Sequence, residues 1–363
     1  MNLRSFLLTT SVALLYIVGP ARLTVAQRPA PPIIYTLDYY DTDGYVVATN
    51  TSGLSVGISS AGAIVAPPNG AKVLLSTMLT PSDQLVWRLH TATAVNENSQ
   101  IAGRAEYFTG GTWVNVSYRY SPVSGSTPVI EPIFPTSGKV GIIVGGINDL
   151  GEVAGVTTGG TNADVIVFHG DVGNGLRSVV LTGLYQASSC LNNLGQITGM
   201  VTINGERRAF RYTPGSNLET FGSLATWRNQ TFKSMGFGIN DLGEWVGEAN
   251  AVKTKSGEYY HATVWSGSRL MDLGVLPGDT SSRANSINFN GTVVGVSYGA
   301  TGNKGFVHMG GYMYSVPEVT LTALPPGVSG FIPRHVKNAG DISGEVLFTS
   351  TTVRGGFVLV PAL

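Results

Sequence analysis

The sequence is poor in charge and in cysteine, and after its first residues it has no apolar run long enough to cross a membrane. Charged residues occupy 12% of the 363 positions, about half of the usual share of about 25%, and 22 basic residues balance 22 acidic ones. A chain without net charge lacks the basic face that nucleic-acid binding requires. Its 43% hydrophobic content argues against intrinsic disorder. The single Cys190 cannot form an internal disulfide, and we interpret it as a small buried residue.

Motifs of catalysis and of cofactor binding are missing as well. The five histidines are scattered, without the His-x-x-x-His spacing typical of zinc sites, and neither a phosphate loop nor a dinucleotide fingerprint is present. Gly-x-Ser-x-Gly does not occur in the strand–turn–helix context of serine hydrolases. We therefore expect no catalytic residue, no metal and no cofactor, and the pattern identifies no binding residue. The histidines are His90, His169, His261, His308 and His335, of which the middle three end aromatic segments, where a hydrogen-bonded histidine is the default.

The first 26 residues have the three parts of a secretory signal peptide. Arg4 supplies positive charge, residues 6–18 form an apolar segment of 13 residues, and residues 24–26 offer small side chains for cleavage. Thirteen residues are too few to span a bilayer as a helix. We predict that residues 1–26 are removed and that the protein is secreted. An uncleaved anchor is the alternative, because Arg22 lies late in the segment.

From residue 27 onward, one motif is repeated seven times. Each copy has Asn at its first position (position 0), Gly three residues later (+3) and Gly seven residues later (+7), and the strongest copies span residues 148–155 and 240–247. Ser99 replaces the first glycine in the second copy, and Lys337 replaces the asparagine in the last. The copies start near residues 50, 96, 148, 192, 240, 288 and 337, with spacings of 46, 52, 44, 48, 48 and 49 residues.

Each position of the motif has a physical reason. Asn followed by Gly at +3 suits a type I turn closed by a β-bulge, and the apolar residue at −1 ends the strand before it. The residue at +4 is polar in six copies, and we expect it to leave the turn on the solvent side. Glycine weakens a strand, so the glycine at +7 indicates a close backbone approach or a bulge.

Each unit holds about four short strands in about 48 residues, which is typical of a propeller blade. The 337 residues after residue 26 correspond to about seven such units. The last unit lacks an outer strand, and residues 33–39 near the N-terminus resemble the missing piece. The sequence therefore predicts an all-β fold, with residues 27–363 forming a single seven-bladed β-propeller closed by an N-terminal strand in the last blade. A solenoid or a pair of β-sandwiches is the alternative.

The repeated pattern Ile-Asn-Asp-x-Gly-x-Val-Val-Gly, followed by Ala-Phe-x-Trp and Asp-Leu-Gly-x-Leu, resembles the HAF-repeat family of extracellular proteins. The best matches are residues 239–247, 261–265 and 271–278, and the likeness covers about residues 146–310. The resemblance implies a secreted or envelope-associated β-repeat protein. The family is largely of unknown function, so it implies no catalytic residue.

Three sets of residues are candidates for functional sites. Two carboxylate pairs, Asp149 with Glu152 and Asp241 with Glu244, occupy equivalent repeat positions, which favours a role in turns over catalysis. An acidic segment near residue 40 is either a hairpin turn, which we favour, or a calcium loop; it contains Asp38, Asp41, Asp43 and Gly44. Tyrosines in glycine-rich stretches are either sugar- or protein-binding groups or buried anchors; they are Tyr39, Tyr40, Tyr45, Tyr259, Tyr260, Tyr312 and Tyr314.

These observations favour a secreted, non-catalytic propeller that binds an extracellular polysaccharide or protein and acts as a monomer. The low charge and high glycine content also allow a structural matrix or envelope protein without a discrete site. A third hypothesis is a glycosidase or lyase on a propeller, which requires one blade to break the repeat with clustered carboxylates or histidines. The second unit deviates most, and Glu131 is its one prominent carboxylate. The discriminating observation is whether unlike side chains converge on the propeller axis.

Overall fold

The computed structural model describes residues 28–40, 43–68, 70–159, 163–169, 177–183, 185–186, 191–224, 233–254, 257–349 and 354–362. The chain divides into two compact units, Met1–Ala30 and Pro31–Leu363, and the fold presented below is that of the second. The predicted signal peptide and Cys190 lie outside the described residues.

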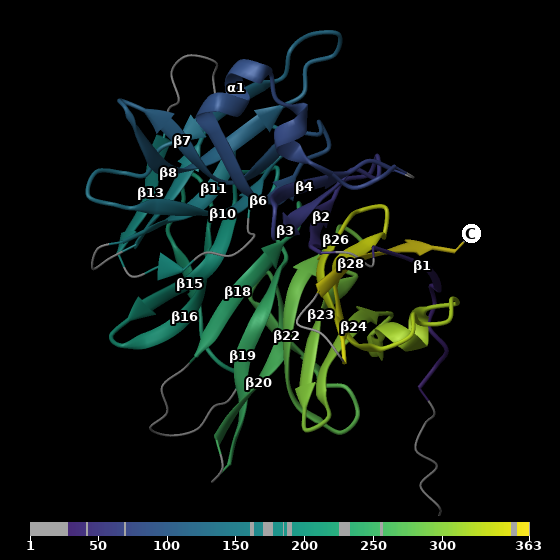
Figure 1. The fold of residues 1–363 in the computed structure, drawn as a ribbon. Helices are drawn as coiled ribbons and strands as arrows, with labels where there is room; N and C mark the ends of the chain where they lie inside the picture. The colour runs from purple at the N-terminus through teal and green to yellow at the C-terminus, as the bar shows by residue number, and fades with distance from the viewer. Residues whose placement is uncertain are drawn as a thin grey trace, which may run out of the picture. The chain divides into compact units, whose positions relative to one another are not determined.

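The described part of the second unit forms seven antiparallel sheets of four strands each, which are the blades of a β-propeller (Figure 1). Blade 1 contains β2 (Tyr45–Thr49), β3 (Ser55–Ser59), β4 (Gly62–Ala66) and β5 (Val73–Leu74). Blade 2 contains β6 (Trp87–Val95), β7 (Ile101–Thr109), β8 (Thr112–Ser121) and β9 (Val129–Ile133). Blade 3 contains β10 (Gly141–Ile147), β11 (Val153–Thr158), β12 (Ala163–Phe168) and β13 (Arg177–Gly183).

The next three blades repeat this order, with the first strand of each innermost in the ring. Blade 4 contains β14 (Tyr185–Gln186), β15 (Ile197–Ile203), β16 (Glu206–Tyr212) and β17 (Glu219–Phe221). Blade 5 contains β18 (Ser234–Ile239), β19 (Trp245–Thr254), β20 (Gly257–Ser266) and β21 (Arg269–Gly274). Blade 6 contains β22 (Asp279–Ile287), β23 (Val293–Gly299), β24 (Gly302–Met309) and β25 (Tyr312–Ser315).

Blade 7 is built from both ends of the second unit. Its inner strands are β26 (Val328–Val336), β27 (Ile342–Phe348) and β28 (Arg354–Pro361), and its outermost strand is β1 (Tyr35–Tyr40). β1 pairs antiparallel with β28 along its whole length, from Tyr35 opposite Pro361 to Tyr40 opposite Gly356. Figure 1 shows the two strands side by side. The prediction of seven blades closed by an N-terminal strand is therefore confirmed.

Helical segments occur in two connections, which the sequence pattern did not indicate. They are η1 (Leu75–Met78), α1 (Pro81–Val86) and η2 (Val316–Val319). The α1 helix begins where the Thr80 hydroxyl accepts a hydrogen bond from the Asp83 amide, and Pro81 occupies its first turn. At six residues it is too short to show helical periodicity. No helix in the described residues is long and apolar enough to cross a membrane.

The hydrophobic core is divided among the interfaces between successive blades. The described buried apolar side chains form clusters that each join two neighbouring blades, such as Val156 of blade 3 with Phe210 of blade 4. The largest rings, Trp245 and Trp265 of blade 5, stack nearly parallel with their centroids 4.1 Å apart and pack against Ala209 and Phe221 of blade 4. A blade therefore has no core of its own and depends on both neighbours.

The asparagines of the repeat form a ring of hydrogen bonds around the propeller axis. In each of blades 1–6, the Asn side chain donates from Nδ2 to the backbone carbonyl of the equivalent residue in the next blade. The bonds run Asn50 to Asn96 (3.0 Å), Asn96 to Asn148 (2.8 Å), Asn148 to Asn192 (3.3 Å), Asn192 to Asn240 (2.8 Å), Asn240 to Asn288 (3.0 Å) and Asn288 to Lys337 (3.1 Å). Lys337 Nζ closes the ring by donating to the Asn50 carbonyl at 2.9 Å. The asparagine thus joins blades as well as shaping its own turn.

The polar residue at +4 belongs to this ring, which corrects the expectation that it leaves the turn on the solvent side. The amide nitrogens of Asn148 and Asn240 donate to the side chains of Glu152 and Glu244, which are partly buried. In the last copy, Lys337 pairs with Asp341. The reason is geometric, because the strand leaving the turn passes beside the asparagine side chain. Position +4 therefore orients the group that reaches the next blade.

The glycine at +7 faces a bulge in the inner strand. In blade 5, β18 pairs with β19 with an extra residue between Gly236 and Gly238, and Gly247 lies opposite Gly236. A Cβ on Gly247 would lie 1.8 Å from the Met235 carbonyl oxygen. The same collision, at 2.7 Å or less, arises at the equivalent glycines of the other blades whose inner strands are described this far, namely Gly57, Gly103, Gly155, Gly295 and Gly344. The expected close backbone approach is therefore confirmed.

We predict that Gly247→Ala lowers the free energy of unfolding by about 1–3 kcal/mol, because the methyl group forces the Met235 carbonyl out of place. Gly141→Ala, at the start of the inner strand β10, is the matched control, since its Cβ would meet two side chains and no backbone atom, Thr158 at 3.2 Å and Asn115 at 3.8 Å. Urea denaturation of the two variants checks this. Equal losses in both would show that the bulge does not require glycine at +7.

We also predict that Lys337→Met lowers the free energy of unfolding by about 3–5 kcal/mol, because it leaves Asp341 without its buried partner and the Asn50 carbonyl without its donor. Lys337→Asn is expected to lose less, since asparagine is the residue with which six other copies bridge this gap. Chemical denaturation measures both. If the asparagine variant is as unstable as the methionine variant, the closing bond is not equivalent to the others.

Candidate functional site

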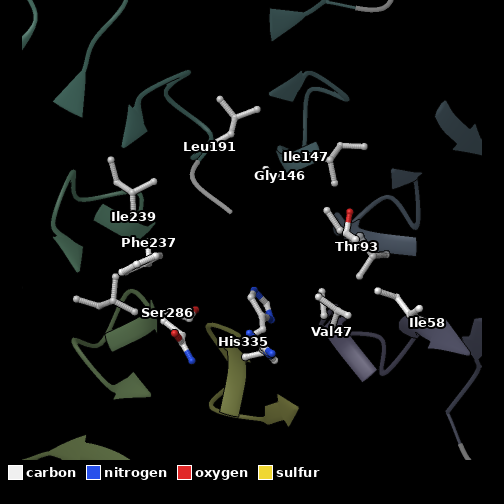
Figure 2. A pocket seen from close by; sticks show the side chains of 18 of the residues that line it. Val47, Ile58, Thr93, Gly146, Ile147, Leu191, Phe237, Ile239, Ser286 and His335 are labelled. Atoms are coloured by element: carbon white, nitrogen blue, oxygen red, sulfur yellow. The ribbon is translucent and has the colours of Figure 1, made fainter. Parts of the chain in front are cut away.

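A cavity of about 490 Å³ lies on the propeller axis, enclosed by the inner strands. Figure 2 shows its lining side chains converging from all sides, with Gly146 and Leu191 facing Ser286 and His335 across the space, and Phe237 facing Thr93. The volume falls within the range of about 300–1,000 Å³ that is typical of small-ligand pockets. The cavity is therefore large enough for a small molecule or a short piece of a polymer.

The bulge in each inner strand supplies the most varied part of this lining. The extra residue stands three positions before the repeat asparagine, and it lines the cavity in each of the six blades where it is described. The residue after it lines the cavity too. In chain order the bulged residues are Val47, Thr93, Gly145, Phe237, Asn285 and Arg334.

The lining is asymmetric although the blades are repeats. Blades 2 and 3 contribute small or apolar residues, such as Ala94 and Gly146. Blades 6 and 7 contribute Arg283, Arg334 and His335 at the same or neighbouring repeat positions. Repetition alone would place like residues at like positions, so this difference marks one side of the cavity as specialised.

Arg283 is held in place by two neutral contacts. Its Nε donates to the Asn285 side-chain oxygen at 3.1 Å, and its guanidinium carbon lies 5.1 Å from the centre of the Phe237 ring. Asn285 is itself fixed by a 2.7 Å hydrogen bond from its Nδ2 to the Pro333 carbonyl. Because a cation over an aromatic face is attracted to it, Phe237 orients the guanidinium. The side chain of Arg283 is therefore preorganised at the cavity wall.

Arg334 has a different environment, because its charge is matched by a buried carboxylate. Its Nε donates to Glu345 Oε1 at 2.7 Å, and Arg354 donates to Glu345 Oε2 at 2.7 Å. Glu345 is fully buried. One carboxylate thus bridges two arginines, an arrangement that fixes Arg334 beside the cavity.

His335 presents an unsatisfied nitrogen in the same region. Its Nδ1 is buried and has no hydrogen-bond partner among the described residues. Burial lowers the pKa of His335 to about 4, with a smaller contribution from the positive charge of Lys337. The imidazole is therefore neutral at neutral pH and can both donate and accept one hydrogen bond.

Further titratable groups lie near Arg283. Burial raises the pKa of the Glu248 carboxyl on β19, and the charge of Arg283 only partly opposes this. Burial likewise raises the pKa of Tyr298 on β23, which the charge of Arg283 lowers and that of Glu248 raises. Tyr45 lines the cavity from blade 1, and its pKa is raised by burial first and then by Glu345. Acidic, basic and aromatic side chains therefore gather on one side of the axis.

The carboxylate pairs singled out from the sequence lie outside the cavity and join blades. Asp149 accepts hydrogen bonds from the Glu97 amide at 2.9 Å and from the Asn193 side chain at 2.8 Å. Asp241 accepts from the Asn193 amide at 2.8 Å. Glu152 and Glu244 bind the repeat asparagines, as described above. We expected these carboxylates to stabilise their own turns; the described bonds of Asp149 and Asp241 instead run to neighbouring blades.

The expectation of a hairpin turn near residue 40 is wrong, because β1 belongs to blade 7 and β2 to blade 1, so the segment connects two blades. Asp43 accepts a hydrogen bond from the Ser60 amide at 2.9 Å, and the Ser60 hydrogen bonds lower its pKa. Asp41 lies outside the described residues. Within the part of the chain that the structure describes, no three His, Cys, Asp or Glu side chains gather as a metal site.

Two of the three histidines expected at strand ends pair with carboxylates, although His261 lies in the middle of β20. His169 Nδ1 lies 2.7 Å from Glu152, and His261 Nδ1 lies 2.9 Å from Asp272. Burial lowers the pKa of His308. Glu131, the prominent carboxylate of the second unit, binds Arg119, with 3.0 Å between its Oε2 and Nε, and does not line the cavity.

The tyrosines divide between core and surface. Tyr314 is buried, Tyr312 is 45% exposed, and Tyr259 and Tyr260 are half-buried. The side chains of Tyr39 and Tyr40 lie outside the description. Tyr45 alone of the described tyrosines in that group lines the cavity.

Sequence reasoning missed the lining residues of blades 5–7. A signal was nevertheless present, because position −3 reads Val, Thr, Gly, Ser, Phe, Asn and Arg in the seven copies, whereas asparagine at position 0 recurs in six of them. Ser189, which holds this position in the fourth copy, lies outside the described residues. A repeat position whose residue changes from copy to copy is expected where the side chain faces a ligand.

Comparison with known proteins supports the fold. No family model and no curated protein matches the chain. Among solved structures, it is similar to the β-propeller domain of the Trilobed protease from Pyrococcus furiosus, with a TM-score of 0.54 and 12% identity over 88% of this chain and 98% of that one. That domain is described as having an open velcro topology, whereas here β1 completes the last blade.

A second similar structure is the acylaminoacyl peptidase of Pyrococcus horikoshii, with a TM-score of 0.51 and 9% identity over 84% of this chain. The chain spans about half of the length of that peptidase, 49%. At these identities the likeness shows the propeller fold alone and carries no conclusion about function.

We predict that His335 stays neutral in the folded protein down to a pH of about 4. Its pKa is lower folded than unfolded (about 6.5), so the unfolded chain binds more protons between these values. Stability therefore falls as the pH is lowered from about 6.5 towards 4. The imidazole signals in NMR titrations, and the loss of this contribution in His335→Gln, check it. A histidine that becomes charged near pH 6.5 would contradict the buried environment.

Proposed function

We propose that this protein is a secreted, non-catalytic binding protein that holds a saccharide segment in its axial cavity. The observation that carries the proposal is the asymmetry of the lining, where Arg283, His335 and Phe237 break a repeat that is otherwise regular. Export rests on the predicted signal peptide, and membership of the HAF-repeat family rests on the repeat pattern.

The chemistry of the cavity favours a saccharide over a protein surface. A cavity of about 490 Å³ admits a few sugar rings but no folded domain. Phe237 and Tyr45 supply flat apolar area, and Asn285, His335 and Arg283 supply hydrogen-bonding groups. Sugars combine apolar ring faces with many hydroxyls, so they match a lining of this kind.

The carboxylates near the cavity favour binding over glycoside hydrolysis. Most glycosidases need two carboxyl groups flanking the scissile bond. No Asp or Glu is among the described residues that line the cavity. Glu345 is held by two arginines, and Glu248 lies behind the inner strand. The proposal therefore assigns no reaction to this site.

We predict that a panel of purified neutral and acidic oligosaccharides contains a ligand whose binding is lost in Val47→Phe, because the ring fills the cavity from a bulge position. Val73→Phe, on the outermost strand of the same blade, is the control and is expected to bind normally. Calorimetry measures the affinity, and mass spectrometry of the recovered sugar tests for turnover.

Two results would overturn the proposal. Binding that survives Val47→Phe would place the ligand outside the cavity. A bound sugar recovered in shortened or unsaturated form would identify an enzyme instead.

A further inference from the structure

The cavity wall carries a guanidinium without a carboxylate partner. Arg283 forms no ion pair with an Asp or Glu within the described residues; its interactions there are the Nε hydrogen bond to Asn285 and the stacking on Phe237. Neither of its terminal nitrogens donates a hydrogen bond to a described residue. The outer edge of the guanidinium, which presents two parallel N–H groups, is therefore available to a ligand.

Arg334 shows that this availability is specific to Arg283. Both arginines line the same cavity from neighbouring blades. Arg334 is bound to the buried Glu345, which also binds Arg354. The fold thus supplies a carboxylate partner for Arg334, whereas such a partner for Arg283 would come from a ligand in the cavity. Glu248 interacts with Arg283 through its charge but forms no described ion pair with it, so an anionic ligand would supply the hydrogen-bonded counter-ion that the guanidinium lacks.

Side chains that can bind the uncharged hydroxyl groups of a ligand also line the cavity. His335 Nδ1 is buried without a partner. Asn285 and Ser286 line the cavity as well. These groups can donate to and accept from hydroxyls. One anionic contact surrounded by hydroxyl-binding groups matches a sugar acid.

We propose that the cavity recognises a saccharide carrying a carboxylate, with Arg283 binding both carboxylate oxygens and Phe237 and Asn285 holding its guanidinium in place. This inference rests on the proposed function and specifies its ligand class. Arginine matches a carboxylate through two parallel hydrogen bonds, which lysine cannot reproduce.

The test uses uronic-acid oligomers, each paired with its methyl ester, so that the members of a pair differ only in carboxylate charge. Galacturonate, mannuronate, guluronate and glucuronate oligomers form the panel, with a neutral galactose oligomer and a sulfated one added. Binding to the full mature chain is measured by calorimetry. We expect at least one uronate to bind about ten- to a hundredfold more tightly than its ester.

Variants locate the charge recognition. Arg283→Gln is expected to remove the preference for the acid over the ester, and Arg283→Lys to restore it only in part. Arg88→Gln is the matched control: Arg88 also lies on an inner strand, but its side chain is 56% exposed, bound to Glu106 and remote from the cavity. It is expected to keep the full preference. Circular dichroism confirms that each variant is folded.

The outcomes separate this inference from the proposed function. If esters and acids bind equally and Val47→Phe abolishes both, the cavity binds sugars but the carboxylate inference is wrong. A sulfated oligomer that binds more tightly than every uronate would also overturn it. If an acidic peptide binds and no saccharide does, both proposals fail. A preference for the acid that survives Arg283→Gln would show that another group binds the carboxylate.

Discussion

The hydrogen bond from each repeat asparagine to the next blade is the interaction on which this propeller depends. It joins two turns that are 44–52 residues apart in the chain, and it does so at the axis, where every blade meets its neighbours. A buried hydrogen bond of this kind contributes about 0.5–1.5 kcal/mol, yet its geometric effect is larger. It fixes how far each inner strand stands from the next and so sets the width of the cavity that the strands enclose.

Much of the fold is readable from the sequence because the signals that define a blade are local. Turn residues and short β-branched runs specify each hairpin, and the length of the chain specifies seven of them. Closure by β1 followed from the same arithmetic. The ring through Lys337 was not predictable in this way, because a single blade seen alone gives its asparagine only a turn to stabilise. Contacts between units become visible only when the units are placed beside one another.

The candidate site was harder to predict for a related physical reason. A regular strand directs alternate residues to one face, but the bulge places two successive residues, such as Arg334 and His335, against the same cavity. Reading with a period of two therefore assigns one of each pair to the wrong side. Arg283 raises a further difficulty, because it lacks, among the described residues, a hydrogen-bonded carboxylate such as the one that Arg334 has in Glu345. Sequence shows both arginines and does not distinguish them.

The bulge has a consequence for how such a protein diversifies. The extra residue in each inner strand has no strictly opposed partner in the ladder, and the glycine on the next strand absorbs the backbone distortion. Its side chain can therefore change without altering the sheet that carries it. In six of the seven blades the bulged residue is described, and all six line one cavity, so each can be varied independently of the others. A designer seeking a new specificity could vary those residues together, in a single library, and leave the remaining architecture untouched.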